Sequence, residues 1–204
     1  PWLGTTTVAE AADLLGLLFG SDVHRAPLRP SRFDRHPPIL TVCTNGRRDQ
    51  CCAQGGLALV RELCDGHPDQ IWECSHIGGH RFAPTALLWP TGQVVGRLDP
   101  GSAETALRLT ERGLVWGAGP VHDRGRTHLD PDRQAAESWV RAQLPPRSAA
   151  SVTSAEAGDD ILVACGTQRW RLRIERREAG ERLESCAAAA IRARVLVPTV
   201  ISGP

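Results

Sequence analysis

The chain has 204 residues, of which 41% are hydrophobic and 23% are charged, and its formal net charge is +1. This is the composition of an ordinary globular protein, and it excludes a strongly basic nucleic-acid-binding protein. No run of 18 apolar residues occurs, so we expect no transmembrane helix. The chain contains no methionine, so we expect that an N-terminal piece is missing or was removed.

Residues 1–37 are predicted to form a helix followed by a linker. Thr7 is suited to cap the helix, Glu10 follows three residues later, and the leucines at 14, 15 and 18 form an apolar stripe. Prolines between residues 29 and 38 then interrupt any regular element.

Residues 38–116 alternate between strand and helix patterns. Apolar runs predict strands at 39–43 and 70–76, on either side of a helix at 56–63. A hairpin at 86–89 and 93–98 and a capped helix at 102–112 follow. The order β-α-β, short irregular piece, β-β-α predicts a thioredoxin-like α/β sandwich with a mixed sheet.

Residues 117–204 are predicted to add a helix and a β-hairpin. The helix at 133–143 follows a proline, and the hairpin joins 161–164 to 169–175. In its second arm, apolar residues at 170, 172 and 174 alternate with arginines, which indicates a half-buried strand. A last strand is expected at 194–200, and the small polar run 148–158 is predicted to be mobile. The arginines at 169, 171, 173, 176 and 177 are interpreted as a solvated strand face, so no nucleic-acid partner is expected.

Cysteine and histidine gather in two short motifs at the ends of predicted strands. Cys43 and Cys52 have C-x8-C spacing, and His76 and His80 have H-x3-H spacing. Thiolates and imidazoles suit zinc or an iron–sulfur cluster. If the two strands are parallel neighbours, both motifs lie at one edge of the sheet. Five of the seven cysteines fall within 43–74, which favours a metal or redox site in a reducing, cytoplasmic setting.

Which thiols serve as ligands is left open by the spacing. Cys51 and Cys52 are adjacent, so their side chains diverge and only one of them is expected to reach the site. Cys74 precedes His76 by two residues, which on a strand places both on one face and makes Cys74 a competing ligand. Cys64 is predicted to pack in the core. Cys165 and Cys186 lie in the C-terminal part of the chain, and the sequence predicts no function for them.

Segments 42–52, 72–83 and 96–98, including the stretch SHIGGHRFA, resemble the sucrase/ferredoxin-like family over about residues 39–114. The resemblance implies a thioredoxin-like ferredoxin domain with a [2Fe–2S] cluster. By that match Cys43 and Cys52 hold one iron, and His76 and His80 hold the other. Two departures stand out: family members usually carry a further N-terminal segment, and some have Asp at the position of His80.

The resemblance implies an electron carrier that acts with a redox partner protein not identified by the sequence. Two imidazoles in place of two thiolates make the cluster site less negative and raise its potential. Their free ring nitrogens can also couple electron uptake to protonation. Arg47, Arg48 and Arg81 flank the motifs, where they raise the potential, dock an acidic partner or are simply solvated.

Two rival functions use the same residues. A structural zinc module would use the same two cysteines and two histidines without redox chemistry. A thiol oxidoreductase would use Cys51 and Cys52, or Cys74, as reactive thiols. The absence of a C-x-x-C motif before the first helix of the sandwich counts against the oxidoreductase.

Overall fold

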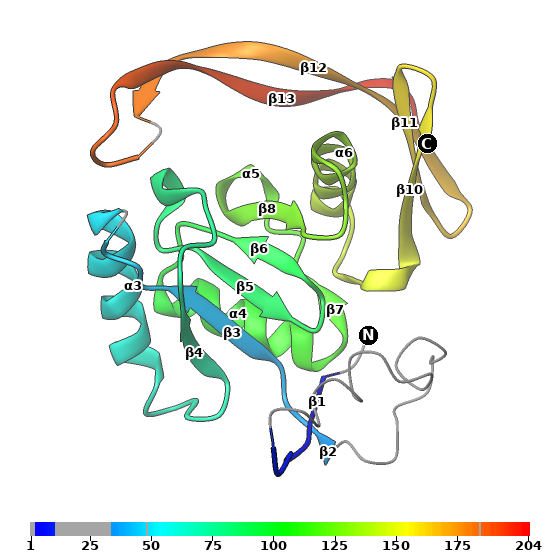
Figure 1. Ribbon diagram of the computed structural model, residues 1–204. Helices are drawn as coiled ribbons and strands as arrows, with labels where there is room; N and C mark the ends of the chain where they lie inside the picture. The colour runs from blue at the N-terminus through cyan, green and yellow to red at the C-terminus, as the bar shows by residue number, and fades with distance from the viewer. Residues whose placement is uncertain (1–2, 11–33, 48, 184) are drawn as a thin grey trace. The chain divides into compact units, whose positions relative to one another are not determined.

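Figure 1 shows the computed structural model, which describes residues 3–10, 34–47, 49–183 and 185–204. The chain divides into two compact units, Pro1–Pro37 and Pro38–Pro204. In the first unit, β1 (Gly4–Thr5) pairs antiparallel with β2 (Asp34–Arg35). The helix predicted around the leucines at 14–18 lies outside the described residues.

The second unit contains a five-stranded mixed sheet. Strands β3 (Ile39–Cys43) and β4 (Ile71–Cys74) are parallel neighbours, and the remaining pairs are antiparallel. The sheet order is β4-β3-β5-β6-β8, with β5 (Ala86–Trp89), β6 (Gln93–Val95) and β8 (Asp123–Arg126). The prediction of an α/β fold with a mixed sheet is confirmed.

Two helices cover one face of this sheet. Helix α3 (Gln50–Leu63) follows β3, and α4 (Pro100–Glu111) follows β6. Both helices contribute to a single apolar core with the strands, because Leu40, Val42 and Leu88 on the sheet pack with Leu59 of α3 and Leu107 of α4. A one-turn helix, η1 (His80–Phe82), connects β4 to β5.

A second apolar core forms between helix α6 and a C-terminal sheet. Helix α6 (Pro131–Ala142) begins at Asp130, whose carboxylate accepts a hydrogen bond from the Arg133 N–H at 2.9 Å. Ahead of it lie β7 (Leu114–Val115) and α5 (Gly119–His122), and after it lie β9 (Arg147–Ser148), which pairs with β7, and η2 (Ala149–Ser151). Val140 of α6 is fully buried in this core with Trp170 and Leu172.

The C-terminal sheet is larger than the predicted hairpin. Its four antiparallel strands are β10 (Val152–Ala157), β11 (Asp160–Cys165), β12 (Gln168–Leu183) and β13 (Ala190–Ser202). The prediction that residues 148–158 are mobile was wrong, because these residues contain strand β10. Its residues are small and polar, and its pairing with β11 stabilises the strand.

The alternation of apolar and arginine residues in β12 is confirmed. Trp170, Leu172 and Ile174 are buried. Arg171 and Arg173 lie on the opposite, half-exposed face, where their Nε groups contact the Asp160 carboxylate at 2.6 and 2.8 Å. This face carries ion pairs, as expected for solvated arginines beside a buried acid.

Gly56 lets α3 approach the end of β3. A Cβ atom at residue 56 would lie 2.2 Å from the carbonyl oxygen of Cys43, a distance that requires the backbone to move. The close approach brings the first turn of α3 to the strand end that carries Cys43.

We predict that Gly56→Ala lowers the free energy of unfolding by about 1–3 kcal/mol, because the overpacking outweighs the gain in helix propensity. Urea unfolding followed by circular dichroism measures this change. Gly66→Ala is the control, since its Cβ would meet nothing closer than 3.9 Å. Equal stability of the two variants would contradict the prediction.

Candidate metal centre

Three of the predicted ligands converge at the carboxyl end of β3. Cys43 is the last residue of this strand, Cys52 lies in the first turn of α3, and His76 follows β4 by two residues. One ligand atom from each residue lies within 4.8 Å of the others. Both thiols are fully buried. The prediction that parallel strands bring the two motifs to one edge is confirmed, since Cys43 and Cys74 are register partners.

His80 belongs to a second group of potential ligands. Gly78 and Gly79 adopt positive φ angles of 89° and 68°, which turn the chain from β4 into η1. The buried His80 ring then places Nδ1 3.6 Å from the Cys51 sulfur and 3.8 Å from the Cys186 sulfur. The ligand atoms of Cys51, His80 and Cys186 lie within 4.8 Å of one another.

Asp49 lies between the two groups. Its side chain is 1% exposed, with Oδ2 3.8 Å from His76 Nδ1 and Oδ1 3.7 Å from His80 Nδ1. Oδ1 also accepts a hydrogen bond from the Cys186 N–H at 2.7 Å. Burial alone would raise the pKa of Asp49, but the Cys186 N–H and the two histidines outweigh it, so the pKa lies below its usual value. The carboxylate is therefore ionised at neutral pH.

Two of these thiols, Cys51 and Cys52, are not activated nucleophiles. Burial, followed by the neighbouring Cys43, raises the pKa of Cys52. Burial, followed by the contact with Cys186, raises the pKa of Cys51. A thiol held in its protonated form reacts slowly, which disfavours the thiol oxidoreductase. A bound cation would reverse this effect, because it stabilises the thiolate.

The donor atoms fit a soft or borderline metal. Buried thiols and imidazoles are ligands for zinc or for iron in an iron–sulfur cluster, whereas calcium and magnesium require oxygen ligands. His76 Nδ1 and Asp49 Oδ2 are buried and have no hydrogen-bond partner among the described residues. Buried polar atoms are normally paired, so these two atoms mark the side of the site where a cationic centre would be stabilised.

The remaining cysteines and loop histidines lie outside both groups. Cys74 pairs in register with Cys43 but is a member of neither group. Cys64, predicted to pack in the core, is instead half-buried at the end of α3. His122 stacks on Trp116 and its Nδ1 lies 3.0 Å from the Gly96 carbonyl oxygen, which is a structural role.

Asp49 and Cys186 are members of the site that the sequence did not reveal, and Cys186 is the more distant of the two. It is an exposed residue in the loop between β12 and β13, 135 positions from Cys51. No spacing rule links two residues so far apart. The loop reaches the site because β12 continues to Leu183, well beyond the strand that the alternating pattern predicted.

Three arginines surround the ring of Phe82, the last residue of η1. The guanidinium carbons of Arg124, Arg81 and Arg97 lie 4.0, 4.4 and 5.5 Å from the ring centroid. Burial lowers the pKa of Arg124, and Arg97 and Arg81 lower it further against the attraction of Asp123. Positive charge thus accumulates beside His80. Arg48, which flanks the first motif in the sequence, lies outside the described residues.

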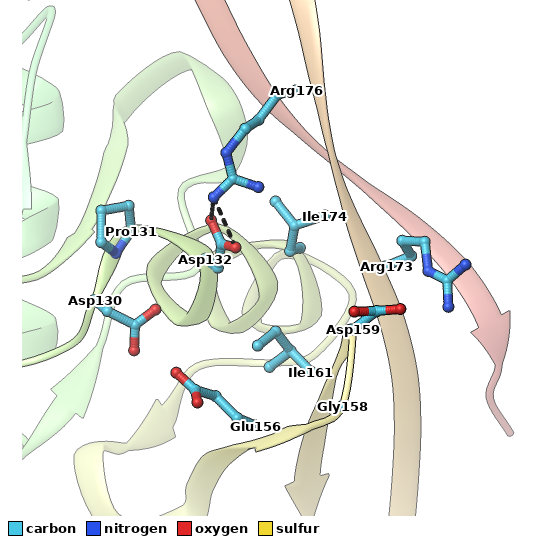
Figure 2. Close-up of a pocket in the computed structure, with 10 residues that line it drawn as sticks. All are labelled: Asp130, Pro131, Asp132, Glu156, Gly158, Asp159, Ile161, Arg173, Ile174 and Arg176. Carbon is cyan, nitrogen blue, oxygen red and sulfur yellow. Dashed lines mark hydrogen bonds and ion pairs between the residues drawn. The ribbon is translucent and has the colours of Figure 1, made fainter.

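A cavity of about 670 Å³ lies elsewhere in the second unit, lined by residues of α6, β10, β11 and β12 and of the turn after β10. Figure 2 shows these residues. The cavity contains neither cysteine nor histidine. Both of its arginines are already engaged, because Arg176 contacts the two oxygens of Asp132 at 2.7 and 2.9 Å (Figure 2) and Arg173 contacts Asp160. The cavity therefore adds nothing to the chemistry of the two ligand groups.

Comparison with known proteins finds one family. The model of the family described as sucrase/ferredoxin-like matches residues 7–119, which is more than half of the chain and includes all four predicted ligands. Searches of curated proteins and of solved structures return no match. Among the described residues, no helix is long and apolar enough to cross a membrane.

We predict that Asp49→Ala loosens the β12–β13 loop. The Cys186 N–H then loses its carboxylate acceptor, a bond of about 1.5–3 kcal/mol, so its amide should exchange with deuterium about tenfold faster or more. Hydrogen exchange read at Cys186 measures this. Asp49→Asn keeps an oxygen acceptor and should have a smaller effect. Unchanged exchange at Cys186 in Asp49→Ala would show that the bond does not hold the loop.

Proposed function

The chain belongs to the sucrase/ferredoxin-like family, and we propose its function from this membership together with one structural observation. The observation is that buried thiols and imidazoles lie together at one edge of the sheet. The proposal is an electron-transfer protein that holds a [2Fe–2S] cluster through Cys43, Cys52, His76 and His80. The observation that carries it is the convergence of Cys43, Cys52 and His76 at the ends of parallel strands. His80 is included because it faces the same carboxylate, Asp49, as His76.

The choice of ligands determines the redox character of the site. When bound, the cluster supplies one-electron chemistry. An oxidised core of two Fe³⁺ ions and two sulfides has a charge of about +2, which two thiolate ligands bring to zero. Four thiolates would bring the charge of the site to about −2. The site with two imidazoles is therefore less negative and takes up an electron more easily. Asp49 would orient the two imidazoles, and coupling of electron uptake to protonation of their free ring nitrogens is part of the proposal.

The chain, purified without oxygen, should contain about two iron and two acid-labile sulfide per molecule and absorb visible light. Iron and sulfide assays with an absorption spectrum test this. Stoichiometric zinc with no sulfide would refute the proposal.

Substitutions in the same assay identify the ligands. Cys43→Ser and Cys52→Ser should lose most of the iron, whereas Cys51→Ser, Cys74→Ser and Cys186→Ser should retain it. His80→Cys should keep the cluster and lower its midpoint potential, because a thiolate adds one negative charge. An unchanged potential in that variant would exclude His80 as a ligand.

A structural zinc centre is the second candidate. Each of the two groups, one with His76 and the other with His80, supplies two sulfurs and one nitrogen within 4.8 Å, and such a donor set suits tetrahedral zinc. The metal analysis above separates the two functions, since a zinc protein is colourless and contains no sulfide.

The arginines around Phe82 indicate the kind of redox partner. Arg81, Arg97 and Arg124 have no carboxylate within 4.0 Å among the described residues, and they flank the element that carries His80. Unpaired positive charge beside an electron-transfer site attracts a partner with an acidic surface. We therefore propose an acidic redox protein as the partner.

We predict that Arg81→Ala slows oxidation of the reduced protein by anionic ferricyanide about two- to fivefold at low salt and speeds oxidation by a cationic ruthenium hexaammine complex. Stopped-flow absorbance at two ionic strengths measures both rates. Arg112→Ala, at the C-terminal end of α4, removes the same charge and should change neither rate. If the two variants change the rates equally, the positive charge of the arginines around Phe82 does not control the approach of the oxidants, and the prediction is refuted.

A further inference from the structure

We propose that Cys51 and Cys186 form a reversible disulfide that fastens the β12–β13 loop to the start of α3. Neither thiol is a ligand in the function proposed above. The disulfide would account for two features which that function leaves unused: the cysteine adjacent to Cys52 and the cysteine in the tail. It does not depend on which metal, if any, the neighbouring group binds.

The two sulfur atoms are already in contact. Cys51 Sγ and Cys186 Sγ lie 3.2 Å apart. A disulfide bond is about 2.05 Å long, so the two sulfurs need to approach by little more than about 1 Å. The 3.2 Å separation is shorter than each of the three contacts that the two sulfurs make with His80.

The backbone around Cys186 is held in place independently of the sulfurs. The Cys186 N–H donates to the buried Asp49 Oδ1 at 2.7 Å. The Leu183 carbonyl oxygen lies 3.3 Å from His80 Nε2. Asp49 is also the residue from which α3 begins, so one carboxylate positions the loop against the helix turn that carries Cys51.

Accessibility distinguishes this pair from the other neighbouring thiols. Cys186 is exposed and Cys51 is half-buried, so an oxidant can reach them. Cys43 and Cys52 also approach each other, but both are fully buried. Cys64 has only a carbonyl and a carboxylate oxygen as hydrogen-bond partners.

The oxidation balances with a hydroperoxide as the oxidant. Each thiol loses its proton and the pair loses two electrons as the S–S bond forms. Hydrogen peroxide takes up the two protons and two electrons, its O–O bond breaks, and two water molecules are released. A dithiol such as dithiothreitol reverses the reaction, because it returns both hydrogens and becomes a cyclic disulfide itself.

The test is peptide mapping of the full chain after treatment with hydrogen peroxide. Remaining thiols are alkylated, the protein is digested, and cross-linked peptides are identified by mass spectrometry before and after dithiothreitol. We expect a predominant peptide pair that joins Cys51 to Cys186 within one chain and separates on reduction. Iron and sulfide are assayed on the same sample, so failure of the cluster proposal is recorded separately.

Variants give the matched controls. Cys186→Ser, on an exposed loop, should abolish the cross-link and leave Cys51 alkylated, whereas Cys165→Ser should not alter it. Circular dichroism confirms that both variants fold. Alkylation of Cys51 and Cys186 to the same extent as Cys64 after peroxide would overturn the proposal. A predominant cross-link between Cys51 and Cys52, between Cys43 and Cys52, or between two chains would also overturn it.

Discussion

The buried carboxylate of Asp49 connects the parts of the candidate centre. It is the N-terminal capping residue of α3, yet its side chain accepts no hydrogen bond from its own helix. It accepts the Cys186 N–H instead and faces both histidines. An Asp at this position usually satisfies the free N–H groups of the first helical turn. Here the Asp49 carboxylate instead connects the start of α3 with the β12–β13 loop and with the two histidines. The arrangement of the site therefore depends on keeping this carboxylate buried and ionised.

The fold supplies that arrangement through the parallel pair β3 and β4. Parallel strands end at the same edge, so Cys43 and the loop that contains His76 and His80 meet there. Gly56 then allows α3 to approach the Cys43 carbonyl, which brings Cys51 and Cys52 to the same edge. The ligands are thus positioned by strand direction and helix approach, two properties of the backbone that do not depend on a bound metal.

Local pattern was enough to predict four strands of the five-stranded sheet, the helices α3, α4 and α6, and part of the site. Alternation predicted the buried face of β12, and spacing singled out the two motifs that contain Cys43 and His76, because both signals lie within short stretches of sequence. The choice of Cys52 over Cys51 came from the family resemblance. The sequence could not reveal β10, whose residues lack an apolar alternation, or the role of Cys186. Both depend on strand pairing across the tail, which is a tertiary effect that no short window contains.

The separation of the two histidines into different groups bears on the choice between a cluster and zinc. A zinc ion in each group would convert four cysteines, at positions 43, 51, 52 and 186, into thiolates. A cluster held by two cysteines and two histidines leaves Cys51 and Cys186 as thiols in contact with each other. A disulfide between these two cysteines and a zinc ion bound by them are mutually exclusive, because a disulfide sulfur is no longer a thiolate ligand. The chemical state of Cys51 and Cys186 therefore reports whether a metal ion occupies the group that contains His80, although neither cysteine is a ligand of the proposed cluster.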